Sequence, residues 1–188
     1  MNQASGQDDW GPLNSLPGNP LMWVLIISEL VVFAAFFAVY AWMRALEPDL
    51  FIASQQQLHP VTGGLNTIVL LTSGLFAALA VEASLRGKVT GCRGWLSAAM
   101  LLGVLFCVVK TGEYRTVWLS GYTLDSNSFF AFYYLLTGFH FAHVLFGLVL
   151  LGLAIWLPSQ ANVVTVTAFW HMVDLIWVLL YPLLYLLR

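Results

Sequence analysis

Charged residues are scarce in this chain, and their scarcity excludes a soluble globular protein. Lysine and arginine together number 7 and aspartate and glutamate 9, so charged residues make up 9% of the 188 residues. A soluble domain of this size carries about a quarter. Lipid must therefore be the solvent for most of the surface. The net charge of −2 and the lack of a basic cluster also exclude nucleic acid as a partner.

Cysteine is nearly absent as well. Cys92 lies in a basic loop and Cys107 in an apolar run, and neither belongs to a CxxC or Cys/His pattern. We therefore expect both to be structural thiols rather than metal ligands. The sequence also contains no Gly-rich phosphate loop and no nucleophile–base constellation. These absences give no indication of a nucleophilic or phosphate-binding catalytic centre, or of a cysteine metal site, within this chain.

Long apolar runs occupy most of the sequence. A helix needs about 20 apolar residues to cross roughly 30 Å of hydrocarbon, and lipid offers no hydrogen-bond partners to an irregular backbone. The runs are unbroken rather than alternating, which excludes a membrane β-barrel. We therefore predict an all-α integral membrane bundle with five transmembrane helices, at residues 20–44, 64–85, 95–118, 128–157 and 164–188.

The segments outside these spans are short. Residues 1–19 are polar and lack the basic start of a cleavable signal peptide, so we predict a short polar N-terminal tail before a single membrane domain at 20–188. The connection at 45–63 is the longest. The other three connections are short, which predicts that successive spans pack as antiparallel neighbours.

The basic residues indicate an orientation. Three of the seven, Arg86, Lys88 and Arg93, lie in the loop at 86–94, which contains no acidic residue. Short loops that are rich in lysine and arginine stay in the cytoplasm. We therefore expect the N-terminus in the cytoplasm and the C-terminus in the periplasm.

Five ionisable side chains lie deep within the predicted spans, where their burial in lipid is costly. Glu29 has only apolar neighbours one turn away, so we expect it to keep its proton at neutral pH. His140 and His143 share one face of the fourth span because they are three residues apart, and His171 and Asp174 share one face of the fifth. Their depths predict a polar cluster made by the first, fourth and fifth spans.

Several interpretations of these polar groups remain open. Lys110 and Glu113, again three residues apart, are expected to form an internal ion pair. The histidines are compatible with simple hydrogen bonds between helices. A membrane cytochrome b would use His140 or His143 together with His171 as axial haem ligands. A small proton-coupled transporter would use the same acids and histidines, but no predicted span is broken near its middle.

Four stretches of the sequence resemble subunit III of the haem-copper cytochrome c oxidases, and a fifth, KTGEY (110–114), is similar to another of its motifs. They follow the family's order and cover nearly all of the chain from residue 20 onward. The four are IISELVVFAAFFAVY (26–40), LNTIVLLTSG (65–74), TGFHFAHVLFG (137–147) and WHMVDLIWVLLY (170–181).

The resemblance implies an accessory subunit without a redox centre, in a bacterial cell membrane. Such a subunit packs against a haem-containing catalytic subunit, binds phospholipid between helix groups and supports proton uptake. Glu29 matches the buried carboxylate of the family's Ser-Glu motif. The remaining matches to its intramembrane polar positions are His140, His143, His171, Asp174 and Glu113.

The chain also departs from the typical member, which has seven spans. Five-helix versions resemble bacterial oxidase subunits and the subunit-III-like proteins that are associated with nitric oxide reductase. The short N-terminus and sparse loops favour the second of these types.

Overall fold

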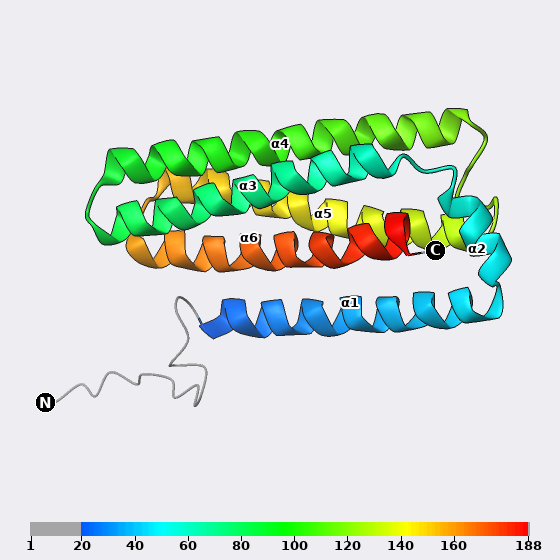
Figure 1. Ribbon diagram of the computed structural model, residues 1–188. Coiled ribbons are helices and arrows are strands. Elements are labelled where there is room, and N and C mark those ends of the chain that lie inside the picture. The colour runs from blue at the N-terminus through cyan, green and yellow to red at the C-terminus, as the bar shows by residue number, and fades with distance from the viewer. Residues whose placement is uncertain (1–19, 188) are drawn as a thin grey trace, which may run out of the picture.

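The computed structural model describes residues 20–187, and the tail predicted at 1–19 lies outside the described part. The described chain is helical throughout, with short connections between the helices (Figure 1). The predicted all-α class is confirmed. The helices are α1 (Pro20–Leu46), α2 (Pro48–Gln55), α3 (Pro60–Leu85), α4 (Val89–Leu119), α5 (Ser128–Trp156) and α6 (Gln160–Tyr181), followed by a π-helical turn (Pro182–Leu186).

Five of these helices are long and apolar enough to cross a membrane, as predicted. Several of their ends differ from the predicted spans, because residues that flank the apolar runs continue the helices. α4 begins at Val89, six residues before the predicted start, and α6 begins at Gln160 rather than at 164. Ser159 caps α6 by accepting a hydrogen bond from the amide of Asn162 (3.2 Å).

The last helix changes character at Pro182. Proline has no amide hydrogen and cannot donate to the preceding turn, so the regular hydrogen-bond ladder is interrupted there. The amide of Leu187 donates to the carbonyl of Pro182 (2.9 Å), which closes a π-helical turn. This wider turn directs Tyr185 into the protein interior, where it is buried.

The connection after α1 contains a helix that the sequence analysis did not predict. Pro48 occupies the first turn of α2, where its fixed φ suits a helix start. Phe51 of α2 is buried against the rings of Tyr40 (5.3 Å between centroids) and Phe129 (5.6 Å). This contact anchors α2 across one end of the bundle (Figure 1).

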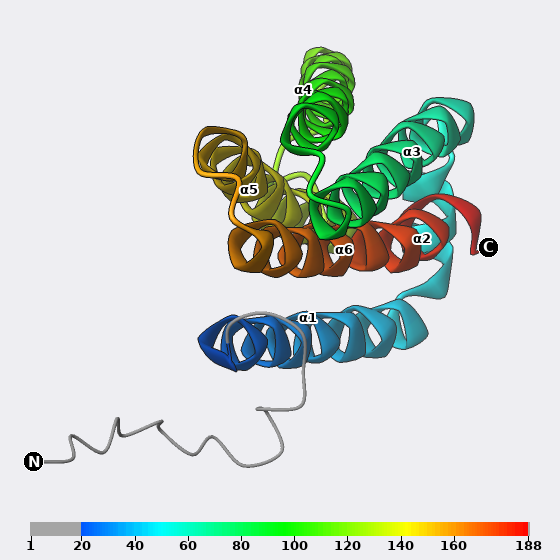
Figure 2. The same ribbon diagram turned by 90° about the vertical axis from the view of Figure 1, so that its left-hand side faces the viewer.

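Helices α3 to α6 form an antiparallel bundle, as the short connections predicted. Successive helices pack together, and α6 also contacts α3. Among the long helices, α1 packs mainly on α5 and α6, and it lies outside the four-helix group (Figure 2). Most of its surface is consequently exposed in the isolated chain.

The centre of the bundle is built around Trp170. Its ring lies against Gly103 of α4 and Gly147 of α5, where a side chain would leave no room. Its indole N–H donates to the hydroxyl of Ser73 (3.0 Å), and that hydroxyl donates to the carbonyl of Ala99 (2.7 Å). The small residues of α3 and its neighbours therefore allow the close helix contacts that membrane bundles need.

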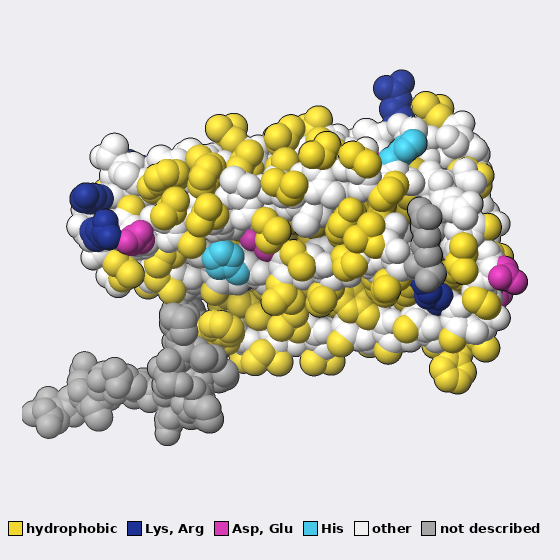
Figure 3. Space-filling model, in the orientation of Figure 1, with side chains coloured by type: hydrophobic (Ala, Val, Ile, Leu, Met, Phe, Trp, Pro, Cys, Tyr) yellow, Lys and Arg dark blue, Asp and Glu magenta, His cyan; other side chains and the backbone are white. Residues whose placement is uncertain are grey.

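The surface has the character of a membrane protein. Hydrophobic side chains cover the length of the face in Figure 3, while lysine and arginine lie toward the two ends. Exposed tryptophans also lie near the helix ends, as an aromatic belt at the lipid–water interface would place them. They are Trp42, Trp95, Trp118 and Trp156.

Candidate functional site

Glu29 of α1 and His143 of α5 meet between the two helices. The carboxylate Oε2 of Glu29 lies 3.1 Å from Nε2 of His143. The Glu29 side chain is 25% exposed and that of His143 is 13% exposed. Phe33 and Phe139 turn their rings toward the imidazole, at 5.6 and 4.7 Å between centroids. The pair is therefore a polar contact within an apolar, aromatic surround.

The other ring nitrogen of His143 is held by a contact within its own helix. Nδ1 lies 2.8 Å from the carbonyl oxygen of Phe139, which can only accept a hydrogen bond, so Nδ1 carries a proton. A neutral His143 then presents a bare Nε2 to Glu29. Oε2 of Glu29 has no hydrogen-bond partner among the described residues, so the two side chains form a close polar contact rather than a hydrogen bond.

His171 and Asp174 form a second pair, on the side of α6 that lies against α3. Nδ1 of His171 is 3.6 Å from Oδ2 of Asp174. Asp174 is buried beside Gly74 of α3, and its Oδ1 has no hydrogen-bond partner among the described residues. The His171 side chain is 47% exposed and lines an open, apolar hollow of about 380 Å³ between α3 and α6.

His140 is separated from both pairs. It is fully buried, stacks on the indole of Trp177 (5.2 Å between centroids) and meets the edge of Phe106. Neither ring nitrogen has a hydrogen-bond partner in the part of the chain that the structure describes.

The structure thus divides the predicted polar cluster into three places. It brings Glu29 to His143 and His171 to Asp174, and it gives no hydrogen bond or ion pair between these two pairs within residues 20–187. Two axial haem ligands would have to face one another across a haem. His140 instead stacks on a tryptophan, which disfavours the cytochrome b interpretation.

Lys110 and Glu113 form the most enclosed charged group. Nζ of Lys110 lies 3.2 Å from Oε1 of Glu113, and both side chains are almost completely buried. The hydroxyls of Tyr133 and Tyr185 donate to the same Oε1 and accept from Nζ, at 3.1 and 2.7 Å. The ammonium also lies 5.3 Å from the ring centroid of Trp177. Hydrogen bonds and aromatic faces compensate the burial of this pair.

The sequence analysis missed the two tyrosines of this group. Tyr133 comes from α5 and Tyr185 from the π-helical turn, so the group joins three elements that are distant in sequence. A signal was nevertheless present, because a tyrosine within an apolar run needs a partner for its hydroxyl. The sequence could not say which partner that would be.

The remaining candidate ligands do not gather into a metal site. Within residues 20–187 no group of three or more His, Cys, Asp and Glu side chains is close enough to hold a metal ion. Cys92 and Cys107 are both buried free thiols.

Comparison with known proteins agrees with this architecture. A family model described as cytochrome c oxidase subunit III matches residues 19–187. The probable cytochrome c oxidase subunit 3 of Mycobacterium tuberculosis H37Rv is 32% identical over 173 residues, which cover 88% of this chain and 85% of the relative. Cytochrome c oxidase subunit 3 of Corynebacterium diphtheriae is 33% identical over 175 residues, with the same coverage of both chains. That of Thermostichus vulcanus is 31% identical over 173 residues, or 87% of this chain and 84% of the relative. This chain belongs to the cytochrome c oxidase subunit III family.

Proposed function

We propose that this protein is a non-catalytic accessory subunit of a haem-copper oxidase in a bacterial cell membrane. The family match over residues 19–187 carries the proposal, because it covers all five spans. The relatives described above are bacterial and bear the name of an oxidase subunit. The partner is a haem-containing catalytic subunit of the subunit I type.

The outer surface favours a protein partner over lipid at one place. His171 is half-exposed within α6 and, together with Asp174, lines an open hollow. Oδ1 of Asp174 is buried there without a hydrogen-bond partner among the described residues. Polar side chains within a span are costly when they face hydrocarbon. A neighbouring transmembrane helix that brings a hydrogen-bond donor to this hollow would remove that cost.

The protein contributes to the complex by packing against the catalytic subunit and by supporting its proton uptake. Glu29 and His143 lie 3.1 Å apart at the surface of the bundle, so the pair offers two neighbouring groups that are able to accept and release protons. Proton uptake by the neighbouring catalytic subunit is the process that such a pair would support. Bound phospholipid completes the proposed role, and the chain contributes no haem, copper or zinc.

A nitric oxide reductase is the alternative partner, and the chain length does not favour it. The relatives from Mycobacterium and Corynebacterium are named as oxidase subunits, yet this five-span chain covers 85% of their length. A short subunit is therefore compatible with an oxygen-reducing partner. The identity of the partner distinguishes the two cases.

Co-purification from native membranes tests the proposal. The tagged full-length chain is isolated in a mild detergent, and accompanying subunits are identified by mass and by their haem spectra. We expect a catalytic haem-copper subunit and cyanide-sensitive oxygen consumption in the purified material. Recovery of a nitric oxide reductase subunit would change the proposed partner. A chain that purifies alone with about one haem or metal ion would contradict the accessory role.

A further inference from the structure

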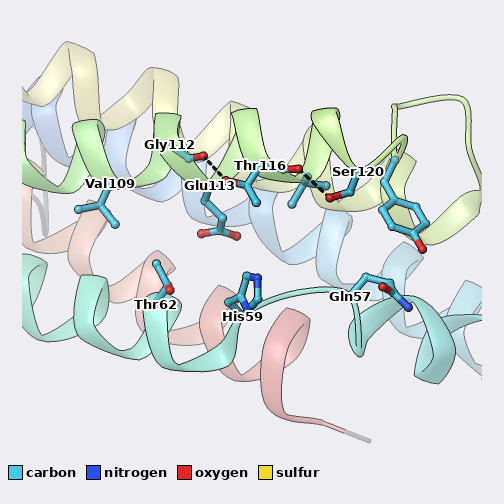
Figure 4. Close-up of a pocket in the computed structure, with 10 residues that line it drawn as sticks. Gln57, His59, Thr62, Val109, Gly112, Glu113, Thr116 and Ser120 are labelled. Carbon is cyan, nitrogen blue, oxygen red and sulfur yellow. Dashed lines mark hydrogen bonds between the residues drawn. The ribbon is translucent and has the colours of Figure 1, made fainter.

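A pocket lies beside the buried Lys110–Glu113 pair, apart from the Glu29–His143 and His171–Asp174 pairs. It lies where the end of α4 runs past the beginning of α3, and the linker from α2 closes one side (Figure 4). Its volume is about 340 Å³. We refer to it as the α3–α4 pocket and define it by Gln57, His59, Thr62, Glu113, Thr116 and Ser120.

Glu113 presents an unused hydrogen-bond acceptor to this pocket. Its side chain is only 4% exposed, and its Oε1 receives all the bonds from Lys110 and the two tyrosines. Its Oε2 is buried and has no partner among the described residues. The carboxylate points toward His59 and Thr62 on the opposite wall (Figure 4). A buried charged acceptor without a partner is expensive, so a ligand that donates to Oε2 gains binding free energy.

Other groups near Glu113 also favour a donor. The hydroxyl of Thr116 donates to the carbonyl of Gly112 (3.0 Å), and that of Ser120 donates to the carbonyl of Thr116 (3.0 Å). Both hydroxyls have used their hydrogen and retain only acceptor capacity. Lys110 already balances the charge of Glu113, so the pocket requires a hydrogen-bond donor rather than an extra net charge.

The opposite wall of the pocket offers hydrogen-bond donors instead of acceptors. His59 is the N-cap residue of α3, but no side chain caps this helix. The first bond of the helix runs from the amide of Gly63 to the carbonyl of His59 (3.3 Å), which leaves the amides of Val61 and Thr62 without a partner within the helix. Helix N-termini of this kind attract phosphate groups. The pocket is therefore suited to a ligand with a donor at one end and a phosphate at the other.

The position of the pocket indicates where such a ligand comes from. The pocket lies at the end of the bundle that carries α2, where Trp118 of α4 is exposed at the level of an aromatic belt. Phospholipid headgroups occupy this level of a bilayer. We propose that the α3–α4 pocket binds the headgroup of a phospholipid that can donate a hydrogen bond, either ethanolamine or glycerol. The donor bonds to Oε2 of Glu113, and the phosphate lies at the N-terminus of α3.

This proposal gives lipid binding a defined site and a selectivity. Choline headgroups carry a quaternary ammonium without N–H groups and cannot donate to Glu113. Phosphatidylcholine should therefore be rejected. The proposal deepens the lipid part of the proposed function but requires no particular catalytic partner, so the two can fail separately.

Lipid retention tests the proposal on the full chain with whatever subunits accompany it. The protein is equilibrated with micelles of equal phosphatidylethanolamine, phosphatidylglycerol and phosphatidylcholine, and retained lipid is measured by native mass spectrometry. We expect about one ethanolamine or glycerol lipid per chain, retained at least about tenfold over phosphatidylcholine, because a bond to a charged acceptor is lost with choline. Glycerophosphoethanolamine as a competitor shows whether the free headgroup binds without its acyl chains.

A steric variant and a matched control place the lipid in this pocket. Thr116→Leu fills the pocket and removes only a hydroxyl that bonds within its own helix, so the fold should persist. Thr111→Leu makes the same change on the same helix, where Thr111 likewise bonds only to the carbonyl four residues earlier, outside the pocket. We expect the first variant alone to abolish the preference. Equal retention of phosphatidylcholine, or an unchanged preference in Thr116→Leu, would overturn the proposal. Loss of partner subunits in Thr116→Leu without any lipid preference would also overturn it and assign the pocket to a partner's side chain.

Discussion

At the level of single residues, the contact between Glu29 and His143 places a carboxyl group and an imidazole 3.1 Å apart in an apolar surround. We predict that the Glu29 carboxyl is protonated at neutral pH, because such a surround favours two neutral groups over an ion pair. Infrared spectra should then contain the carbonyl band of a protonated carboxyl that disappears in Glu29→Gln. Glu82→Gln is the control, since Glu82 is exposed and paired with Arg86. Loss of an ionised carboxylate band in Glu29→Gln would instead show that Glu29 is ionised and contradict the prediction.

The buried Lys110–Glu113 pair leads to a second prediction at this scale. Lys110→Met should lower the free energy of unfolding by about 3–5 kcal/mol, because it leaves the buried carboxylate without its cation. The double variant Lys110→Met, Glu113→Gln should recover most of this loss, since no uncompensated charge remains and the amide oxygen still accepts from the tyrosines. Denaturant unfolding in micelles, followed by tryptophan fluorescence, measures both. Strictly additive effects of the two substitutions would show that the pair is not coupled.

At the level of helices, the contact of Trp170 with α5 depends on a missing side chain. A Cβ atom at Gly147 would lie 2.7 Å from the indole ring, which is closer than packed atoms approach. We predict that Gly147→Ala lowers the free energy of unfolding by about 1–3 kcal/mol. Gly138→Ala on the same helix has open space around the new methyl group and should be neutral or slightly stabilising. An equal effect of the two substitutions on the thermal midpoint would contradict the role of this contact.

The long helices could be predicted because the sequence of each one is sufficient to identify it. Length and apolar content are properties of one segment, and short connections force neighbours such as α3 and α4 to pack antiparallel. Helix α2 has only eight residues, and its position depends on Phe51 reaching Tyr40 and Phe129. The long connection after α1 leaves its neighbours unspecified, and only the depths of the polar groups indicated that α1 lies beside α5 and α6.

In the site too, features that depend on one segment were predicted, and features that depend on contacts between helices were missed. The spacing of three residues placed His171 beside Asp174 on one helix face, and the structure brings these two together. The depth argument put Glu29 near His143 but also grouped both with residues on another face. Depth along a span does not specify the direction around a helix, and that direction depends on contacts between helices. Tyr185 was out of reach for the same reason, since a π-helical turn redirects it.

At the scale of the whole molecule, the two ends of the bundle differ in charge, and this difference predicts the orientation. One end carries Arg86, Lys88 and Arg93 around the α3–α4 turn, and the opposite end carries α2 with Glu47 and Asp49. Retention of short basic loops in the cytoplasm places the first end inside and α2 in the periplasm.

Cysteine labelling in intact cells tests this orientation with little background, because both native thiols are buried. Gln56→Cys, at the end of α2, and Gly91→Cys, in the first turn of α4, place exposed thiols at opposite ends of the bundle. Gly91 has room for the change, since its nearest neighbours lie 3.8 Å from a new Cβ atom. We predict that a membrane-impermeant maleimide labels Gln56→Cys in intact cells and labels Gly91→Cys only after permeabilisation. The reverse pattern would invert the topology and place the α3–α4 pocket on the cytoplasmic side.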